Sequence, residues 1–263
     1  MPHIAALYRY PVKGFTPEAC NTLTVLDDGR IAGDRVLGIR FADTAAADEA
    51  WSRKTEMVTL MNTPGLARLH LTFEAEARRL RLSLASTVIV DAVLTEEGRQ
   101  RLATAVAEYV LTLAENPLAG HPERLPLRVI GDGLTPRYHD AEAGQVTLHG
   151  RGSLRTLTAT LANTAVSERR FRSNIALEGL GAWEEQSWAG RKVRIGTVEF
   201  DVARPKVRCL ATHANPTTGE RDVPMLTTLT QLFGQEKPTF GVAMVPSQAG
   251  GHMHVGDPVM LVD

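Results

Sequence analysis

Short runs in which apolar and polar residues alternate dominate the first half of the chain. Alternation with a period of two is typical of β-strands that bury one face, because successive side chains point to opposite sides of a sheet. Pro11 stops the first run, and Asp27-Asp28-Gly29 follows the second. The predicted strands are residues 4–10, 23–26, 35–41, 69–73, 80–84 and 88–94. We therefore expect the first half to be mostly β, with residues 43–51 as a surface loop.

One long segment has a helical period instead. It begins at Thr95, a candidate N-cap, and carries Glu96 and Glu97 in its first turn, where the helix dipole favours negative charge. The apolar face of this helix comprises Leu102, Val106, Tyr109, Val110 and Leu113. Asn116-Pro117 is the predicted end, and residues 116–126 are the candidate linker. We divide the chain into a first unit, residues 1–120, and a second unit, residues 121–263.

The second half mixes strands with short helices. A hairpin is predicted at residues 191–202 around the turn Gly196-Thr197, and short helices are predicted to begin near Ser153 and Pro224. The remaining predicted strands are residues 127–130, 175–177, 240–245 and 258–262, with the glycine-rich segment 250–257 as a reversal between the last two. The expected fold is mainly β with flanking helices, an α+β protein.

Composition narrows the class of protein. The chain has 263 residues and a formal net charge of −1, so neither nucleic acid nor an anionic membrane is an expected partner. Its two cysteines, Cys20 and Cys209, lie far apart and give no disulfide framework. The N-terminal residues do not resemble a signal peptide, and no apolar run is long enough to span a bilayer. We expect a soluble cytoplasmic protein.

The candidate chemistry centres on Cys209. This residue follows a predicted strand, and Arg204, Lys206 and Arg208 precede it within five positions. Nearby positive charge lowers the pKa of a thiol and favours the thiolate, which attacks electrophiles and binds soft metals. From the residues alone, a buried structural cysteine is the favoured alternative, because free cysteine commonly fills apolar cores.

Other cationic loops could bind an anion. Lys13 lies in a YPVKG segment, Arg35 in a GDR segment, and Arg151 between two glycines at the start of a predicted helix. Each alone is typical of solvated surface, and Ser153 as a plain N-cap explains the glycine loop as well. Arg172 closes a cluster of three arginines, and a guanidinium fork matches phosphate geometry. His252 and His254 are expected to be exposed.

The order of these motifs resembles the MOSC domain family. An FRSN element at residues 171–174 precedes an arginine-cysteine pair, an Asn-Pro and a Thr-Gly, as in the two-part proteins that include the amidoxime-reducing components. The resemblance implies a MOSC-type β-barrel preceded by a β-rich N-terminal domain. It also implies molybdenum cofactor binding, with Cys209 as the metal ligand and Asp140 beside the substrate. The cofactor-binding positions implied by the family motifs or by their charge are Lys13, Arg35, Arg151, Arg172, Asn174 and Arg208.

Four positions depart from the family pattern. Gly14 stands where the family has a serine after the lysine, and Ser173 stands where it has a proline. Ala141 and Glu142 follow Asp140 in place of two hydroxyl residues. The changes at positions 14, 141 and 142 remove hydroxyl contacts, and Ser173 should loosen the backbone. All four leave the cations and the cysteine in place.

The implied activity is an oxidoreductase that reduces N-hydroxylated or N-oxide compounds. If Cys209 binds molybdenum, only Cys20 remains, so the chain cannot hold an iron–sulfur cluster of its own. No G-x-G-x-x-G fingerprint for a dinucleotide is present. Electrons must therefore come from a separate protein, such as a ferredoxin, a cytochrome b5-like protein or a flavoprotein reductase. An electron carrier with acidic groups would dock on Arg169, Arg170, Arg204 and Lys206.

Two other functions fit the same residues. A non-catalytic carrier of molybdenum cofactor or of its sulfur needs the same cysteine and the same cations. A zinc-binding module could instead use Cys209 with His213, four positions further on.

Overall fold

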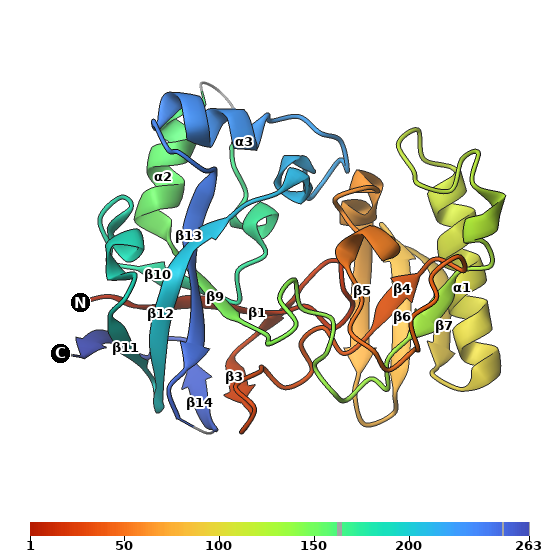
Figure 1. The fold of residues 1–263 in the computed structure, drawn as a ribbon, viewed down its shortest axis with the longest axis horizontal. Helices are drawn as coiled ribbons and strands as arrows, with labels where there is room; N and C mark the ends of the chain where they lie inside the picture. Colours follow the sequence, from red (N-terminus) through yellow and green to blue (C-terminus); the bar gives the residue numbers. More distant parts are fainter. Residues whose placement is uncertain (162–164, 249, 263) are drawn as a thin grey trace.

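The computed structural model describes residues 1–161, 165–248 and 250–262. The protein is mainly β with few helices, as the alternating pattern predicts, and its elements form two lobes that lie side by side (Figure 1). Both ends of the chain lie in the same lobe. No helix in these described ranges is long and apolar enough to cross a bilayer.

An eight-stranded sheet forms the first of these lobes, with the strand order β15-β11-β12-β13-β9-β10-β1-β2. Its strands are β1 His3–Arg9, β2 Glu18–Cys20, β9 Val146–Gly150, β10 Ile175–Glu178, β11 Lys192–Ile195, β12 Val198–Val207, β13 Thr239–Pro246 and β15 Val259–Val262. The sheet is mixed, because β9 runs parallel to β10 and antiparallel to β13. Strands β11 and β12 form the predicted hairpin around Gly196-Thr197.

The two ends of the large sheet approach each other. Within the described ranges its ladder is open, so no closed barrel is seen. A single antiparallel bridge joins His3 to Pro258, and the amide of Ile4 donates to the carbonyl of Asp257 at 2.9 Å. The first strand of the chain therefore contacts the segment that begins its last strand.

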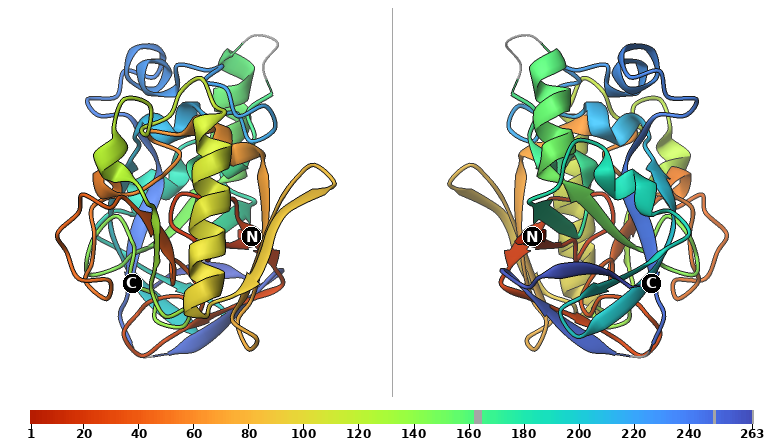
Figure 2. Two further views of the ribbon diagram at one scale, coloured as in Figure 1. Left: turned by 90° about the vertical axis from the view of Figure 1, so that its right-hand side faces the viewer. Right: turned by 90° about the vertical axis from the view of Figure 1, so that its left-hand side faces the viewer.

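The second lobe packs one helix against small sheets. Strands β5 Leu69–Glu74, β6 Arg79–Leu84 and β7 Thr87–Val93 form one antiparallel sheet, and β4 Gly38–Arg40 pairs with β8 Arg128–Ile130. Helix α1, Glu96–Leu111, covers them (Figure 2). The apolar face of α1 lies in the same core as the inward side chains of β5 and β6, including Leu71 and Leu82.

Helix α1 begins as predicted and ends earlier. The Oγ1 atom of Thr95 accepts a hydrogen bond from the amide of Gly98 at 3.1 Å. The last helical residue is Leu111, not a residue next to Asn116. The Thr112 hydroxyl donates to the Tyr109 carbonyl at 2.6 Å, and the Asn116 side chain accepts from two backbone amides of the following turn. These local side-chain contacts compete with further helical turns.

The chain passes between the two lobes more than once. Strand β8, which follows the candidate linker, pairs with β4 of the first half, whereas β1 pairs with β10 of the second. Strand β3, Thr22–Val25, pairs with β14, Gly251–His254. The division at residues 120 and 121 stays a prediction about folding units, and β1 and β3 of the first unit pair with strands of the second.

Two local predictions for the second half need correction. The glycine-rich segment 250–257 is not a plain reversal, because it contains β14, whose exposed histidines alternate with buried Met253. Helix α2, Arg151–Thr160, begins two residues earlier than expected, so Ser153 lies inside its first turn and is not its N-cap. The short helix predicted from Pro224 is confirmed: α3, Met225–Thr227, continues as a π-helical turn over Thr228–Leu232.

Candidate functional site

A cleft lies where loops of both halves of the chain meet. It encloses about 800 Å³, including the part open to solvent. The first half contributes the loops that hold Lys13, Arg35 and Thr59, and the second half contributes those that hold Asp140 and Cys209. The charged residues that line it are Lys13, Arg35, Lys54, Asp140, Arg170, Arg172, Lys206 and Arg208. Cations therefore far outnumber carboxylates in the cleft.

Cys209 lies at the end of β12, as predicted. The strand ends at Val207, Arg208 donates its amide to the Pro238 carbonyl at 2.8 Å, and a 3₁₀ helix, Leu210–His213, begins directly after the cysteine. The Cys209 carbonyl accepts from the amide and the hydroxyl of Thr212, both at 3.0 Å. These contacts fix the backbone, and the half-buried thiol lines the cleft.

The side chain of Arg208, the residue before Cys209, is held by two backbone carbonyls. Its Nε atom donates to the Phe240 carbonyl at 2.8 Å and its Nη1 atom to the Phe171 carbonyl at 2.6 Å. Burial lowers the pKa of this guanidinium to about 10, and the neighbouring Cys209 opposes that shift. Arg208 thus joins β13 to the loop before β10 and places a positive charge beside the thiol.

Arg35 and Arg172 share one aromatic platform. Their guanidinium carbons lie 5.1 and 4.3 Å from the centre of the Tyr10 ring, a distance at which cations attract a π face. Both residues have left-handed backbone angles, with φ of 54° and 52°. Burial lowers the pKa of Arg172 to about 10, and Tyr10 opposes the shift. Arg172 also donates to the Phe15 carbonyl, which ties it to the first half.

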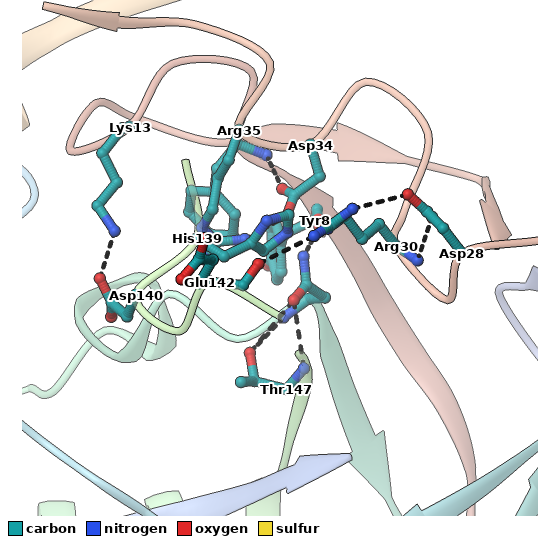
Figure 3. Close-up of polar contacts among 12 residues, drawn as sticks. Tyr8, Lys13, Asp28, Arg30, Asp34, Arg35, His139, Asp140, Glu142 and Thr147 are labelled. Carbon is teal, nitrogen blue, oxygen red and sulfur yellow. Dashed lines mark hydrogen bonds and ion pairs between the residues drawn. The ribbon is translucent and has the colours of Figure 1, made fainter. Parts of the chain in front are cut away.

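Lys13 and Asp140 form an ion pair across the cleft (Figure 3). Lys13 is 5% exposed, and its pKa is lowered because burial outweighs the attraction of Asp140. For Asp140, burial would raise the pKa, but the Lys13 ammonium holds it below its usual range. Asp140, which is predicted to lie beside the substrate, is therefore in direct contact with Lys13, which is predicted to bind the cofactor.

A buried carboxylate orders the loop around Arg35. Asp34 is 1% exposed, accepts from the Tyr10 amide at 2.7 Å and pairs with Arg35. Its Oδ2 atom lies 3.4 Å from Nε2 of His139, which also lines the cleft. Burial would raise the pKa of Asp34, but Arg35 and His139 lower it to about 2. The carboxylate therefore stays ionised and orients both neighbours.

Two predicted cofactor residues lie outside the lining of the cleft. Asn174 is fully buried: its Oδ1 atom accepts from the amide and hydroxyl of Thr147 at 3.3 and 3.2 Å, and its Nδ2 atom donates to the Tyr8 carbonyl at 3.3 Å. Arg151 donates to both carboxylate oxygens of Glu168 at 2.9 and 3.0 Å. Both side chains have protein partners here, and their roles toward a cofactor stay predictions.

The start of α2 already holds a carboxylate. Glu185 is fully buried and accepts from the Ser153 hydroxyl at 2.9 and 2.8 Å, and the Trp183 amide donates to the same hydroxyl at 2.8 Å. Burial raises the pKa of Glu185, and the hydrogen bond from Ser153 opposes that shift. The loop around Arg151, which the sequence suggested as a binding site for an external anion, therefore packs against the side chain of Glu185.

Several lining residues gave no signal in the sequence. Lys54 and Thr59 follow a surface loop, and Gln145 precedes β9. Thr59 Oγ1 and Gln145 Oε1 are buried with no hydrogen-bond partner among the described residues. The sequence predicts Lys206 as a cation before Cys209 and in the docking face, but not that burial lowers its pKa to about 8, against the attraction of Asp140. Isolated polar residues of this kind are too common in loops to be singled out by pattern.

The glycine after Lys13 has a steric reason in this chain. Gly14 has a φ of 82°, and an added Cβ would lie 2.6 Å from the Cα of Thr59. A serine at position 14 would therefore force the two loops apart. The departure from the family pattern at this position matches the close approach of the Thr59 loop.

The zinc-binding module suggested for Cys209 and His213 loses support in this geometry. His213 Nε2 accepts a hydrogen bond from the Leu226 amide at 3.2 Å, and no group of three or more His, Cys, Asp or Glu side chains within the described ranges could hold a metal ion.

Arg170 is 3% exposed and donates to both carboxylate oxygens of Asp222 at 2.7 and 2.8 Å. Arg170 therefore cannot form part of an exposed docking face.

The donor set suits a large anionic group that carries a soft metal. The cleft is lined by one thiol, several cations and a single carboxylate, and four of its lining residues, Thr59, His139, Gln145 and Arg170, carry a buried polar atom with no hydrogen-bond partner among the described residues. A metal held by one protein sulfur needs its other ligands from a cofactor, and phosphate oxygens suit the cations. The residues present therefore fit a molybdopterin-type cofactor.

Comparison with known proteins agrees with this chemistry. A sequence model of the MOSC domain matches residues 135–260, which include Arg172, Arg208 and Cys209. Mitochondrial amidoxime-reducing component 1 of Mus musculus is 32% identical over 98% of this chain and 82% of its own length. Molybdenum cofactor sulfurase of Caenorhabditis elegans is 36% identical over 28% of this chain, and the match spans only 10% of the sulfurase.

Structural similarity to solved proteins is weaker. The crystal structure of the YUAD protein from Bacillus subtilis aligns over 98% of this chain and 94% of its own, with a TM-score of 0.45 and 10% identity, a level that carries no argument about function. The whole-length match to the mouse protein and the domain match are independent of that comparison. The chain belongs to the MOSC domain family, in the group that includes the mitochondrial amidoxime-reducing components.

Proposed function

We propose that this protein binds molybdenum cofactor and reduces N-hydroxylated or N-oxide compounds with electrons from a separate carrier protein. The observation that carries the proposal is one thiol, Cys209, in a cleft lined by cations from both halves of the chain. The mouse relative named an amidoxime-reducing component supports the substrate class. When bound, the cofactor supplies the two-electron redox chemistry of molybdenum.

The residues of the cleft divide the remaining work. Cys209 supplies a sulfur ligand to the metal, and Arg35 and Arg172 bind the anionic part of the cofactor from their shared position over Tyr10. Arg208 places a further positive charge next to the thiol. Asp140 holds the Lys13 ammonium in place and lies on the substrate side of the cleft.

The proposed reaction needs protons as well as electrons. A hydroxylamine R–NH–OH takes up two electrons and two protons, its N–O bond breaks, and R–NH2 and water leave. Lys206 has a pKa of about 8 and is therefore mostly protonated at neutral pH, so its Nζ atom is a suitable proton donor. His139, whose pKa burial lowers, is mostly neutral there, and Asp140 is ionised.

Closure of the large sheet into a MOSC-type barrel is part of the proposal. The bridge between His3 and Pro258 supports it, and so does the Val259 amide, which donates to the Pro2 carbonyl at 2.9 Å. A barrel closed at this seam would hold the first strand, and with it the Lys13 loop, beside the cleft.

A non-catalytic carrier of molybdenum cofactor or of its sulfur is the second candidate. The match to proteins named molybdenum cofactor sulfurase supports it, since that match covers part of the same chain. Both functions need Cys209 and the same cations. Only turnover separates them.

Analysis of the purified protein tests these functions together. We expect molybdenum and pterin in equal amounts, and reduction of a hydroxylamine when reduced viologen supplies the electrons. Cofactor without turnover would favour the carrier. Protein that binds zinc, or that lacks both molybdenum and pterin after expression in a host that makes the cofactor, would contradict the proposal.

A further inference from the structure

The hydroxyl of Thr59 is buried and has no partner among the described residues. Thr59 is 4% exposed, and its Oγ1 atom accepts and donates no hydrogen bond there. The backbone of the same turn is satisfied, because the Thr59 amide donates to Asn62 Oδ1 at 2.9 Å and its carbonyl accepts from the Thr63 amide at 2.8 Å. A buried polar group without a partner is destabilising, so a bound molecule is the expected partner of this hydroxyl.

The neighbours of Thr59 indicate the charge of the molecule that would bind its hydroxyl. Thr59 lines the cleft together with Lys13 and Gly14. The Gly14 backbone approaches so closely that an added Cβ would lie 2.9 Å from the Cβ of Thr59. No side chain can therefore stand between Thr59 and the Lys13 loop. Since cations dominate this cleft, the group that faces the hydroxyl is anionic.

We propose that Thr59 Oγ1 donates a hydrogen bond to an anionic oxygen, of the phosphate type, of the bound cofactor. The inference rests on the proposed function and assigns a residue to the same site. Lys13 supplies charge, which attracts an anion from any direction, whereas the hydroxyl supplies a directional donor fixed by the turn at residues 59–63.

Thr59→Val tests the inference, because valine keeps the shape of threonine and removes the hydroxyl. We expect the variant to lose pterin about tenfold faster on dialysis than the wild type, which corresponds to about 1.4 kcal/mol. The Tm of the cofactor-free variant should stay the same or rise, because an unpartnered buried hydroxyl is removed. A hydroxyl with only a structural role would instead lower that Tm. Thr59→Ser should retain pterin as the wild type does.

Thr63→Val is the matched control. Thr63 is fully buried in the same turn, but its hydroxyl already donates to Asn62 Oδ1 at 3.1 Å. We expect this variant to be less stable than the wild type and to lose pterin at the wild-type rate. Equal pterin loss from both valine variants would assign the effect to the turn and overturn the inference.

The remaining outcomes separate the inference from the proposed function. If the wild type holds pterin and Thr59→Val loses it no faster, the hydrogen bond is wrong and the cofactor site stands. The same result is expected of a hydroxyl that binds only an ordered water. If the wild type contains no pterin, the proposed function fails and the inference fails with it.

Discussion

Cys209 differs from the other cysteine of the chain in its surroundings. Both are partly buried, but Cys209 lines the cationic cleft beside Arg208, whereas Cys20 lies at the end of β2 and packs against the core of the large sheet. A thiolate next to a guanidinium is a soft, charged ligand. Position within the fold, and not residue type, separates the two thiols.

Cys209→Ser should abolish molybdenum-dependent turnover and leave the fold intact. A hydroxyl is a harder and far less acidic ligand than a thiol, and the two side chains have nearly the same size. The checks are turnover with reduced viologen and the Tm. Cys20→Ser is the control and should turn over at the wild-type rate. Wild-type turnover by Cys209→Ser would disprove the metal-ligand assignment.

Lys206 should make cofactor binding depend on pH. Burial lowers its pKa to about 8, so the ammonium is charged below that pH and neutral above it. An anion in the cleft is attracted only by the charged form. Retention of pterin during dialysis should therefore fall as the pH rises from 7 to 9. In Lys206→Arg, which stays charged, retention should change little over this range, and an equal fall in both proteins would contradict the role of Lys206.

At the scale of elements, the start of α2 depends on one hydrogen-bonded group. Ser153 donates to buried Glu185, and the Trp183 amide donates to Ser153, so the serine joins α2 to the 3₁₀ helix Glu184–Trp188. The Ser153 hydroxyl therefore connects α2 to this 3₁₀ helix and does not cap α2.

Ser153→Ala should lower the free energy of unfolding by about 1–3 kcal/mol, because the buried carboxylate and the amide both lose their partner. Urea denaturation measures the change. Ser187→Ala is the matched control, since Ser187 donates to the Glu184 carbonyl at 2.8 Å at an exposed position. The control should change stability by less than about 1 kcal/mol. Equal losses in both variants would show that the buried link adds nothing.

The elements themselves were largely predictable. Short apolar runs located β5, β6 and β7, with leucine alternation in β6, and the glycine turn located the hairpin of β11 and β12. The errors occurred where long-range pairing decides: residues 251–254 form β14 because β3, from the N-terminal part of the chain, pairs with them. Helix boundaries failed where side chains such as Thr112 and Asn116 bind the backbone.

At the scale of the whole molecule, the cysteine count limits electron supply. With Cys209 on the metal, Cys20 alone cannot hold an iron–sulfur cluster, so we expect no turnover with NADH alone. Reduced viologen should restore turnover. Steady oxidation of NADH by the isolated protein in the presence of substrate would refute this expectation.

Carrier-driven turnover should also depend on salt. Arg204 is exposed and Arg169 and Lys206 are partly exposed, so these three cations remain the predicted docking face, from which buried Arg170 is excluded. Screening should slow turnover driven by an acidic electron carrier as the salt concentration rises, while viologen-driven turnover changes little. Arg204→Ala should reduce the salt dependence. Carrier-driven rates that do not respond to salt would remove the docking face.

The sequence by itself determined the local features: the period of the strands, the start of α1 at Thr95 and the placement of Cys209 after a strand among cations. These depend on neighbours a few residues apart, so the local pattern contains them. Only the tertiary structure decided that Lys13 pairs with Asp140, that Glu185 occupies the start of α2 and that the Thr59 hydroxyl has no partner among the described residues. The two contacts join segments distant in sequence, and the burial of Thr59 against Gly14 does so too, so all three features depend on how the whole chain packs.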